Sequence, residues 1–308
     1  MDMTEPERMS LEGLRGELRL DESMRRHTSW RAGGAAERTY RPADLEDLCA
    51  FLRALPDSEP VMLVGLGSNL LVRDGGLRGT VVFTHPALQR MQFMRHAGEE
   101  AMLYVEAGVA SPKAARFAAV HGHEGAEFLA GVPGTIGGAL AMNAGCYGKE
   151  TWEIVSGVLT IDRRGQRHER TAADFHIGYR TVSPVPPRQE YFAAAWLKLP
   201  FGDGDWSRLR MKELLQRRIS SQPLAQPNAG SVFRNPPGDY AARLIESCGL
   251  KGFRIGDAMV SPKHANFIVN LGTARAGDIE ALIEHVQNTV AKLRGVTLER
   301  EVQIVGEV

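Results

Sequence analysis

One glycine-rich segment limits the folds open to this chain more than any other stretch. Residues 131–145 hold five glycines and one proline among small residues, and no charged side chain. Glycine leaves room for another group against the bare backbone and reaches positive φ without strain. Its amide groups could cradle a pyrophosphate or lie along a flat ring. We therefore expect this loop to hold a large ligand, with a tight structural loop as the alternative.

A second informative segment, Gly-Ser-Val-Phe-Arg-Asn-Pro, occupies residues 230–236. It presents a single hydroxyl, that of Ser231, between a glycine and an apolar pair. Together the two segments suggest a large phosphorylated cofactor that faces a proton donor.

Length and charge set the outer bounds. The chain has 308 residues, enough for two or three domains, and its 37 basic residues balance 37 acidic ones. Zero net charge gives no general attraction to nucleic acid or to an anionic membrane. The polar N-terminus lacks a signal-peptide core, and no apolar stretch approaches the ~20 residues that span a bilayer. We expect a cytoplasmic monomer without a nucleic-acid or membrane partner.

The sequence gives little support for a metal site. Its three cysteines are too scattered for a disulfide framework, and their spacing fits no zinc ribbon. Four residues at the end of a predicted helix superficially resemble a metal cluster, namely His121, His123, Glu124 and Glu127. They lie beside glycines without an evident distant ligand, so we expect a helix-end loop and no bound metal.

Apolar runs and turn residues predict a mixture of strands and helices. Strands are predicted at 61–64, 80–83, 103–106, 155–161, 192–199 and 298–305. Helices are predicted at 111–122, 207–219 and 279–293. Ser111 is the expected N-cap of the first helix, Gly295 ends the last one, and the proline-rich stretch 183–187 is expected to be a loop. Without strict βαβ alternation, the pattern favours the α+β class.

The loop Gly65–Leu70 follows a predicted strand and begins like a dinucleotide-binding fingerprint. Leu70 stands where the third glycine belongs, which argues against a Rossmann fold. The loop could still bind phosphate through its amides and through the side chains of Ser68 and Asn69.

Three charged residues are candidates for a site. Arg180 follows an aromatic residue and could bind a carboxylate bidentately, although a surface arginine is the alternative. Arg218 closes a predicted helix, where the dipole favours cations in any case. Glu301 lies in an apolar strand and is either solvent-facing or functional.

These motifs, in this order, resemble the UDP-N-acetylenolpyruvoylglucosamine reductase family. The matching segments run from 28–34 to 301–306 and include 143–148, the Tyr179–Arg180 pair and 263–267. The resemblance implies an FAD-binding α+β fold of the vanillyl-alcohol-oxidase (PCMH) type. We expect an N-terminal extension at 1–22, FAD-binding subdomains at 23–85 and 86–203, and a substrate domain at 204–297. The last strand, within 298–308, is expected to pack back on the first subdomain.

The resemblance also implies a reaction in two halves. NADPH reduces FAD and leaves, and the enolpyruvyl ether of UDP-N-acetylglucosamine then takes its place. Flavin N5 delivers hydride to the vinyl carbon, which gives UDP-N-acetylmuramate for peptidoglycan synthesis. Ser231 matches the family's proton donor, while Arg180 and Glu301 match the residues that stabilise the enolate-like intermediate. Glu301 would be most useful protonated, which requires a raised pKa.

Further positions carry over from the family with their ligands. Non-covalent FAD is expected against Gly33, Gly34, Gly65, Gly67, Ser68, Asn69, Leu70, Gly131, Pro133, Gly134, Thr135, Gly137, Gly138, Asn143 and Gly145. Substrate contacts are expected at Arg218, Asn235, His264 and Asn266. The chain resembles the shorter second type of the family, which lacks an insertion whose tyrosine covers the substrate diphosphate.

Two other functions are compatible with the same motifs. An alcohol oxidase of this fold often tethers FAD to a histidine near the first glycine loop, and His85 is the nearest candidate. A non-catalytic nucleotide-sugar-binding relative is the second alternative, but all three catalytic positions are filled here.

Overall fold

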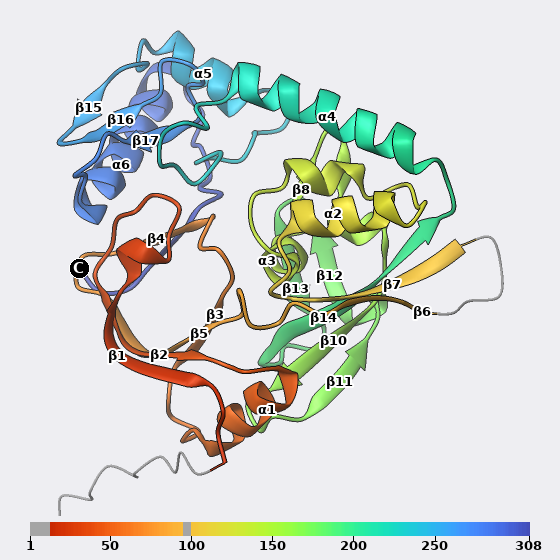
Figure 1. The fold of residues 1–308 in the computed structure, drawn as a ribbon. Coiled ribbons are helices and arrows are strands. Elements are labelled where there is room, and N and C mark those ends of the chain that lie inside the picture. The colour runs from red at the N-terminus through yellow and green to blue at the C-terminus, as the bar shows by residue number, and fades with distance from the viewer. Residues whose placement is uncertain (1–12, 95–99) are drawn as a thin grey trace, which may run out of the picture.

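The first part of the molecule is a four-stranded sheet in the order β1-β2-β5-β3 (Figure 1). The structure is a computed structural model that describes residues 13–94 and 100–308. β1 is antiparallel to β2, whereas β5 is parallel to both β2 and β3. The strands are β1 (Glu17–Ser23), β2 (Ala35–Arg41), β3 (Val61–Val64) and β5 (Leu77–Phe83), and the 3-10 helix η1 (Met24–Arg26) follows β1.

Helix α1 (Leu45–Ala54) covers one face of this sheet. The side chain of Asp44 caps its first turn, and Tyr40 of β2 stacks on Phe51 with ring centroids 3.7 Å apart. The extension predicted at 1–22 is thus wrong for residues 17–22, because these residues form β1 at the edge of the sheet. Residues 1–12 lie outside the described part of the chain.

A second, antiparallel sheet has the order β11-β10-β14-β7-β6. Its strands are β6 (Met91–Met94), β7 (Glu100–Glu106), β10 (Val155–Asp162), β11 (Arg167–Arg170) and β14 (Glu190–Pro200). Helices α2 (Ser111–Val120) and α3 (Ile136–Ala141) bury their apolar side chains against one face. Short 3-10 helices, η2 (Glu127–Gly131), η3 (Thr151–Glu153) and η4 (Ala172–Asp174), connect these elements.

Two small hairpins project from this second sheet toward the site. The first pairs β8 (Gly145–Cys146) with β9 (Lys149–Glu150), and the second pairs β12 (Phe175–Gly178) with β13 (Thr181–Pro184). The loop predicted at 183–187 therefore begins two residues later than expected, since Ser183 and Pro184 still pair in β13.

Helix α4 (Gly204–Ser221) leads across the top of Figure 1 to a third, smaller unit. This unit contains α5 (Ala241–Ser247), β15 (Arg254–Ile255), β16 (Ala258–Val260), β17 (Ile268–Asn270) and α6 (Ala276–Arg294). The predicted apolar stripe of α6 is buried from Ile279 to Val290, whereas Leu293 at its end is exposed. Gly295 ends the helix at a φ of 68°, as glycine favours.

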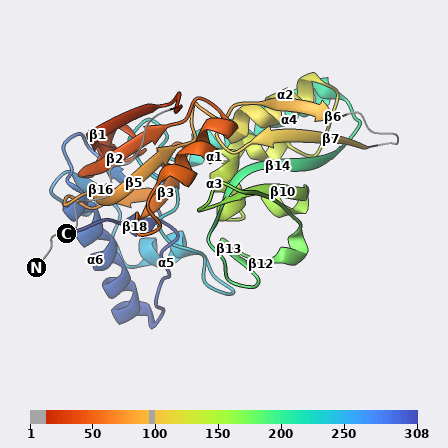
Figure 2. The same ribbon diagram turned by 90° about the horizontal axis from the view of Figure 1, so that it is seen from below.

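The chain then returns to the first unit through β18 (Gln303–Val305), which pairs in parallel with β4 (Leu70–Val72). Figure 2 shows β18 between the first sheet and α6. Ile304 packs against the core of the third unit, while Val305 packs against the first sheet. The strand predicted at 298–305 is shorter than expected, because residues 299–301 pair with the loop that carries Ser231.

One predicted cap is also wrong. Ala110 is the N-cap of α2, and Ser111 is its first residue, with a buried hydroxyl that has no partner among the described residues. None of the described helices has both the length and the apolarity required to cross a membrane.

Candidate active site

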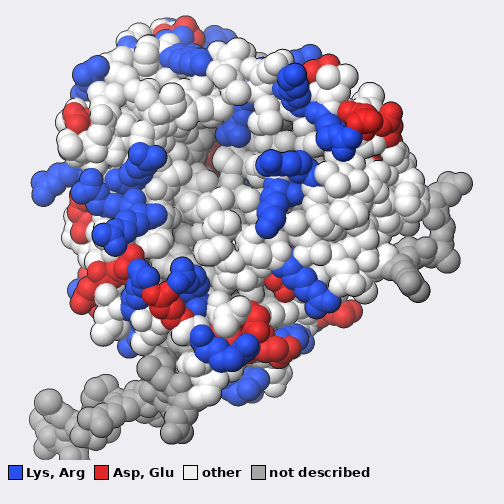
Figure 3. Space-filling view, in the orientation of Figure 1, with Lys and Arg blue, Asp and Glu red and all other residues white. Residues whose placement is uncertain are grey.

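A cavity of about 370 Å³ lies where the three units meet. The Gly65–Leu70 loop, the glycine-rich segment and residues of the third unit line it, and Ser231, Arg180 and Glu301 are among them. The face drawn in Figure 3 is hollowed near its centre, with Lys and Arg side chains on both sides of the hollow. The volume of the cavity falls in the usual range of small-molecule sites.

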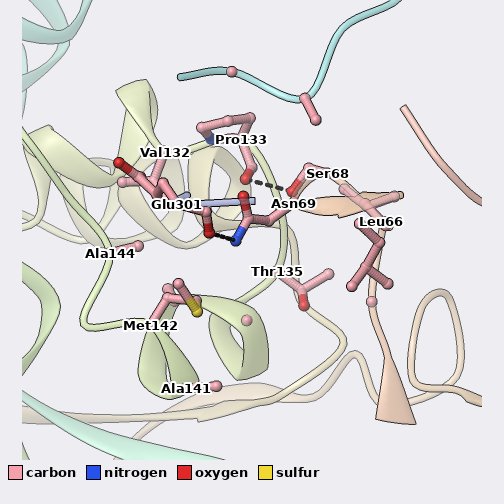
Figure 4. Close-up of a pocket in the computed structure, with 18 of the residues that line it drawn as sticks. Leu66, Ser68, Asn69, Val132, Pro133, Thr135, Ala141, Met142, Ala144 and Glu301 are labelled. Carbon is pink, nitrogen blue, oxygen red and sulfur yellow. Dashed lines mark hydrogen bonds between the residues drawn. The ribbon is translucent and has the colours of Figure 1, made fainter. Parts of the chain in front are cut away.

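Hydrogen bonds join the walls of this cavity (Figure 4). Ser68 donates its hydroxyl proton to the carbonyl of Pro133 at 2.8 Å, which connects the two glycine loops. The amide of Asn69 donates to the carbonyl of Glu301 at 3.1 Å. These two side chains, predicted to bind phosphate, therefore donate to neighbouring backbone in this structure.

The glycines of these loops meet two different needs. At Gly131 a Cβ would lie 2.8 Å from the Cys146 sulfur, and at Gly134 it would lie 2.7 Å from the Ser68 hydroxyl oxygen. A Cβ at Gly138 would meet no described atom within 4 Å, although Gly138 lines the cavity. The first two glycines allow close packing, whereas Gly138 leaves open space for a ligand.

A second cavity of about 290 Å³ adjoins the first and shares Gly65, Thr135 and Gly138 with it. Thr160, Arg188, Glu190 and aromatic side chains line its far end. The two cavities meet at a wall that contains Gly65 and Gly138, and their joint volume is enough for a large ligand such as FAD. Twelve of the fifteen predicted FAD positions line one cavity or the other.

The other three predicted FAD positions are not in either lining. A Cβ at Gly33 would lie 2.8 Å from the carbonyl oxygen of Val72, and one at Gly34 would collide with Asp74. These glycines are needed for the packing of the first unit. Asn143 is buried with its side-chain amide bonded to Glu150 and to the carbonyl of Gly178, so it shapes the loop.

Arg180 occupies the two-residue turn between β12 and β13 with a φ of +55°, which is rare for a residue other than glycine. Its Nε donates to Oε1 of Glu301 at 2.9 Å. The Nη atoms donate to the carbonyls of Asn143 and Gly145, at 3.3 and 3.0 Å. The guanidinium is thus fixed before any ligand binds.

Glu301 is the acidic member of this ion pair, and its side chain is 16% exposed. Burial raises the pKa of its carboxyl, because it disfavours the charged form, and the Arg180 charge opposes this effect only in part. Glu301 is therefore protonated more easily than an ordinary glutamate, even though an arginine contacts it.

Ser231 follows Gly230, whose φ is +75°. The loop is held by Asn266, whose side chain accepts from the Phe233 amide at 2.9 Å and donates to the Phe233 carbonyl at 2.8 Å. The amide of Glu301 donates to the Val232 carbonyl at 2.8 Å. The predicted proton donor and the predicted acid are thus neighbours through the backbone.

Of the four predicted substrate residues, the structure places Arg218 alone in the lining of the first cavity. Burial lowers its pKa, and its Nε donates to Gln222 at 2.8 Å. Asn235 accepts from the Ala241 amide at the start of α5, and Asn266 holds the Ser231 loop. His264 packs edge-on against Phe267, and burial lowers its pKa.

Sequence reasoning missed several lining residues, among them Cys146, Met142 and Gln222. Met142 and Cys146 lie inside the segments 131–145 and 143–148, and Gln222 follows Arg218 by four residues, so proximity to these positions was the available signal. Burial raises the pKa of the Cys146 thiol. His85, the candidate for covalent attachment, lies outside both linings and contacts the Gly108 carbonyl at 2.8 Å.

Comparison with known proteins places the chain in a class and then in a family. An FAD-binding domain model matches residues 36–170, and the model of the UDP-N-acetylenolpyruvoylglucosamine reductase C-terminal domain matches residues 222–305. The protein is therefore an FAD-binding oxidoreductase of the α+β class that the sequence predicted.

Relatives along the whole chain carry the assignment further. The reductase of Thiobacillus denitrificans is 56% identical over 96% of this chain and 94% of its own, and that of Alkalilimnicola ehrlichii is 57% identical over 95% and 96%. The crystal structure of the Thermus caldophilus enzyme superposes with a TM-score of 0.77 at 32% identity, over 94% of this chain and 99% of that one. The chain belongs to the UDP-N-acetylenolpyruvoylglucosamine reductase family.

Proposed function

We propose that this protein reduces UDP-N-acetylglucosamine enolpyruvate to UDP-N-acetylmuramate with NADPH, in the cytoplasmic synthesis of peptidoglycan precursors. One observation carries the proposal. Arg180, Ser231 and Glu301 come from three distant segments and line one cavity, next to the glycine loops of an FAD-binding domain.

The two adjoining cavities would hold FAD non-covalently, mostly against backbone of the Gly65–Leu70 and 131–145 loops. Bound FAD supplies the hydride that passes from NADPH to the vinyl carbon of the substrate. We propose that the FAD-binding subdomains span 17–85 and 86–203 and that the substrate domain spans 204–297.

Three side chains would act on the substrate. Ser231 would give its proton to the carbon next to the substrate carboxylate, and such a weak acid needs close placement. Arg180 would stabilise the negative charge that develops there, because its guanidinium is already oriented by three acceptors. Glu301, protonated through its raised pKa, would donate a hydrogen bond to the same charge.

Arg218 would meet a phosphate of the substrate or of the cofactor. It lines the same cavity from the last turn of α4, and its described hydrogen bond is to the neutral amide of Gln222. A half-buried guanidinium in such a place has a strong preference for a ligand anion.

The test is an anaerobic two-step reaction. The purified protein is reduced with NADPH, the enolpyruvyl substrate is added, and flavin absorbance is followed near ~460 nm. We expect rapid reoxidation in the parent protein and in Ser220→Ala, an exposed control, and slow reoxidation in Ser231→Ala with normal NADPH reduction. Reoxidation by oxygen alone would favour an oxidase, and a protein that takes up no FAD would contradict the assignment.

A further inference from the structure

Arg234, three residues after Ser231, adds a second connection between the Ser231 loop and the β12–β13 turn, beside the one that runs through Glu301. Its Nη2 donates to the main-chain carbonyl of Arg180 at 3.1 Å. Its own amide donates to the Glu299 carbonyl at 2.9 Å, and its Nη1 lies 3.6 Å from the exposed Glu299 carboxylate. Arg234 does not line either cavity.

The carbonyl that Arg234 holds belongs to a strained residue. Arg180 has a φ of +55° in a two-residue turn, and a left-handed conformation at a non-glycine residue must be stabilised by its surroundings. The direction of the peptide plane after Arg180 determines where its side chain leaves the backbone. A donor on that carbonyl therefore restrains the whole residue.

The Ser231 loop does not need the Arg234 side chain for its own shape. Asn266 already bonds both peptide groups of Phe233, and the Glu301 amide bonds the Val232 carbonyl. The guanidinium of Arg234 instead reaches from this loop to the β12–β13 turn, which belongs to a different unit of the molecule.

We propose that Arg234 is a positioning residue for the reduction of the substrate: through the Arg180 carbonyl, it holds the cation of the site at a fixed place relative to Ser231. The proposal rests on the function proposed above, since it needs Arg180 and Ser231 to act on one substrate. Misplacing a reacting group by about 1 Å can cost on the order of 10²-fold in rate.

Three variants test the proposal in the two-step anaerobic reaction. Arg234→Met keeps the aliphatic stem and removes the donors, and we expect reoxidation by substrate to slow by about 10- to 100-fold, with NADPH reduction changed by less than about 3-fold. Arg234→Lys keeps one donor for the Arg180 carbonyl and is expected to stay within about 5-fold of the parent. Glu299→Gln removes the exposed partner of Arg234 and is expected to change reoxidation by less than about 2-fold.

The pH–rate profile of reoxidation provides a second readout, because a purely structural role of Arg234 would not shift it. The Arg234 charge helps to lower the pKa of Glu301 against the larger effect of burial. Loss of that charge in Arg234→Met should move the Glu301 limb of the reoxidation profile to higher pH, and Arg234→Lys should return it.

Several outcomes would overturn the inference. The inference fails if Arg234→Met reoxidises within about 2-fold of the parent, as Glu299→Gln is expected to do, or if it slows both half-reactions equally. If Arg234→Met takes up no FAD, Arg234→Lys decides, and a lysine variant that binds FAD but reoxidises slowly contradicts the proposal. A parent protein that the substrate cannot reoxidise would instead contradict the proposed function.

Discussion

Each of the two adjoining cavities is lined by a glutamate that is paired with an arginine, and the two pairs differ in their chemistry. Arg180 contacts Glu301 at 2.9 Å, and both line the first cavity. Glu190 lines the second cavity and contacts Arg170, which lies outside that lining, at 2.6 Å. The two carboxyl groups are similarly buried, with side chains 16% and 8% exposed.

Their pKa values nevertheless move in opposite directions. Burial raises the pKa of Glu301, and Arg180 does not cancel this effect. Burial alone would also raise the pKa of Glu190, but hydrogen bonds from Arg170 and Thr160, with the charges of Arg170 and Arg188, lower it to about 2.

The number of donors explains the difference. Glu190 accepts two hydrogen bonds from Arg170 and one from Thr160, and a second arginine lies 3.4 Å away. Glu301 accepts one side-chain hydrogen bond, from Arg180, which shares its remaining donors with two carbonyls. A saturated carboxylate stays ionised and stabilises the fold, whereas an undersaturated one is free to hold a proton.

The largest effects should come from replacing each of the two arginines, Arg180 and Arg170, by methionine in separate variants. Arg180→Met should slow reoxidation by substrate on the order of 10²- to 10³-fold, because the developing charge loses its cation. Arg170→Met should leave reoxidation within about 3-fold but lower the free energy of unfolding by about 3 kcal/mol, since Glu190 remains buried without its partner. Stopped-flow absorbance and urea titration measure the two effects, and equal kinetic losses would remove the distinction.

Glu190→Gln should mainly affect stability. Lowering the pKa from 4.5 to about 2 corresponds to about 3 kcal/mol of stability from ionised Glu190. Since the folded-state pKa is lowered, this contribution is complete above about pH 4.5 and is lost as pH falls through about 2. Urea titrations of the parent and variant should therefore converge at low pH, with the exposed neighbour Glu169→Gln as control. A constant difference at every pH would contradict the prediction.

Replacing Glu301 by glutamine should instead affect the reaction more than the stability of the fold. Glu301→Gln imitates the protonated acid, so reoxidation should slow by only about 10-fold and unfolding should change by less than about 1 kcal/mol. In the parent, the rate should fall as pH rises through the raised pKa of Glu301, and this limb should be missing in the variant. Rate profiles from acid to alkaline pH check this, with Glu299→Gln as control. A limb that persists in Glu301→Gln belongs to another group.

The smallest effect concerns Gly138, which lines both cavities. Gly138→Ala should raise the stability of the FAD-free protein by about 0.5–1 kcal/mol, because alanine favours the helix. It should also weaken FAD binding several-fold, because its Cβ enters the space left for the ligand. FAD titration and thermal unfolding measure both, and Gly277→Ala in α6 is the helical control. Unchanged FAD affinity would show that the two cavities do not hold one cofactor across Gly138.

Local sequence patterns correctly predicted the elements whose burial is determined by their own apolar residues. The apolar periodicity of α6 and the short apolar runs of β3 and β5 were confirmed, because burial of one face or one run defines these elements. β1 was missed because it is a half-exposed edge strand, rich in charged residues, whose burial does not alternate along the strand. β18 is shorter than predicted because residues before it bond to the Ser231 loop.

The roles of the asparagine side chains were harder to predict than those of the charged residues and the serine. Arg180, Ser231 and Glu301 were identified through the resemblance, and they line one cavity. Asn235 and Asn266 bond to backbone groups that the sequence gives no means to locate. An asparagine next to a motif can serve a ligand or the chain itself, and only the folded geometry separates these two uses.

The contact between Asn69 and Glu301 closes a loop of 232 residues, next to the parallel pairing of β4 with β18. Contacts of such long range form late in folding, because the intervening chain must be organised before its ends can meet. We expect the first sheet to acquire protection before the catalytic cavity does, so that a folding molecule is structured for some time before it can turn over substrate. Pulsed hydrogen exchange that finds β18 protected before β5 would contradict this order of assembly.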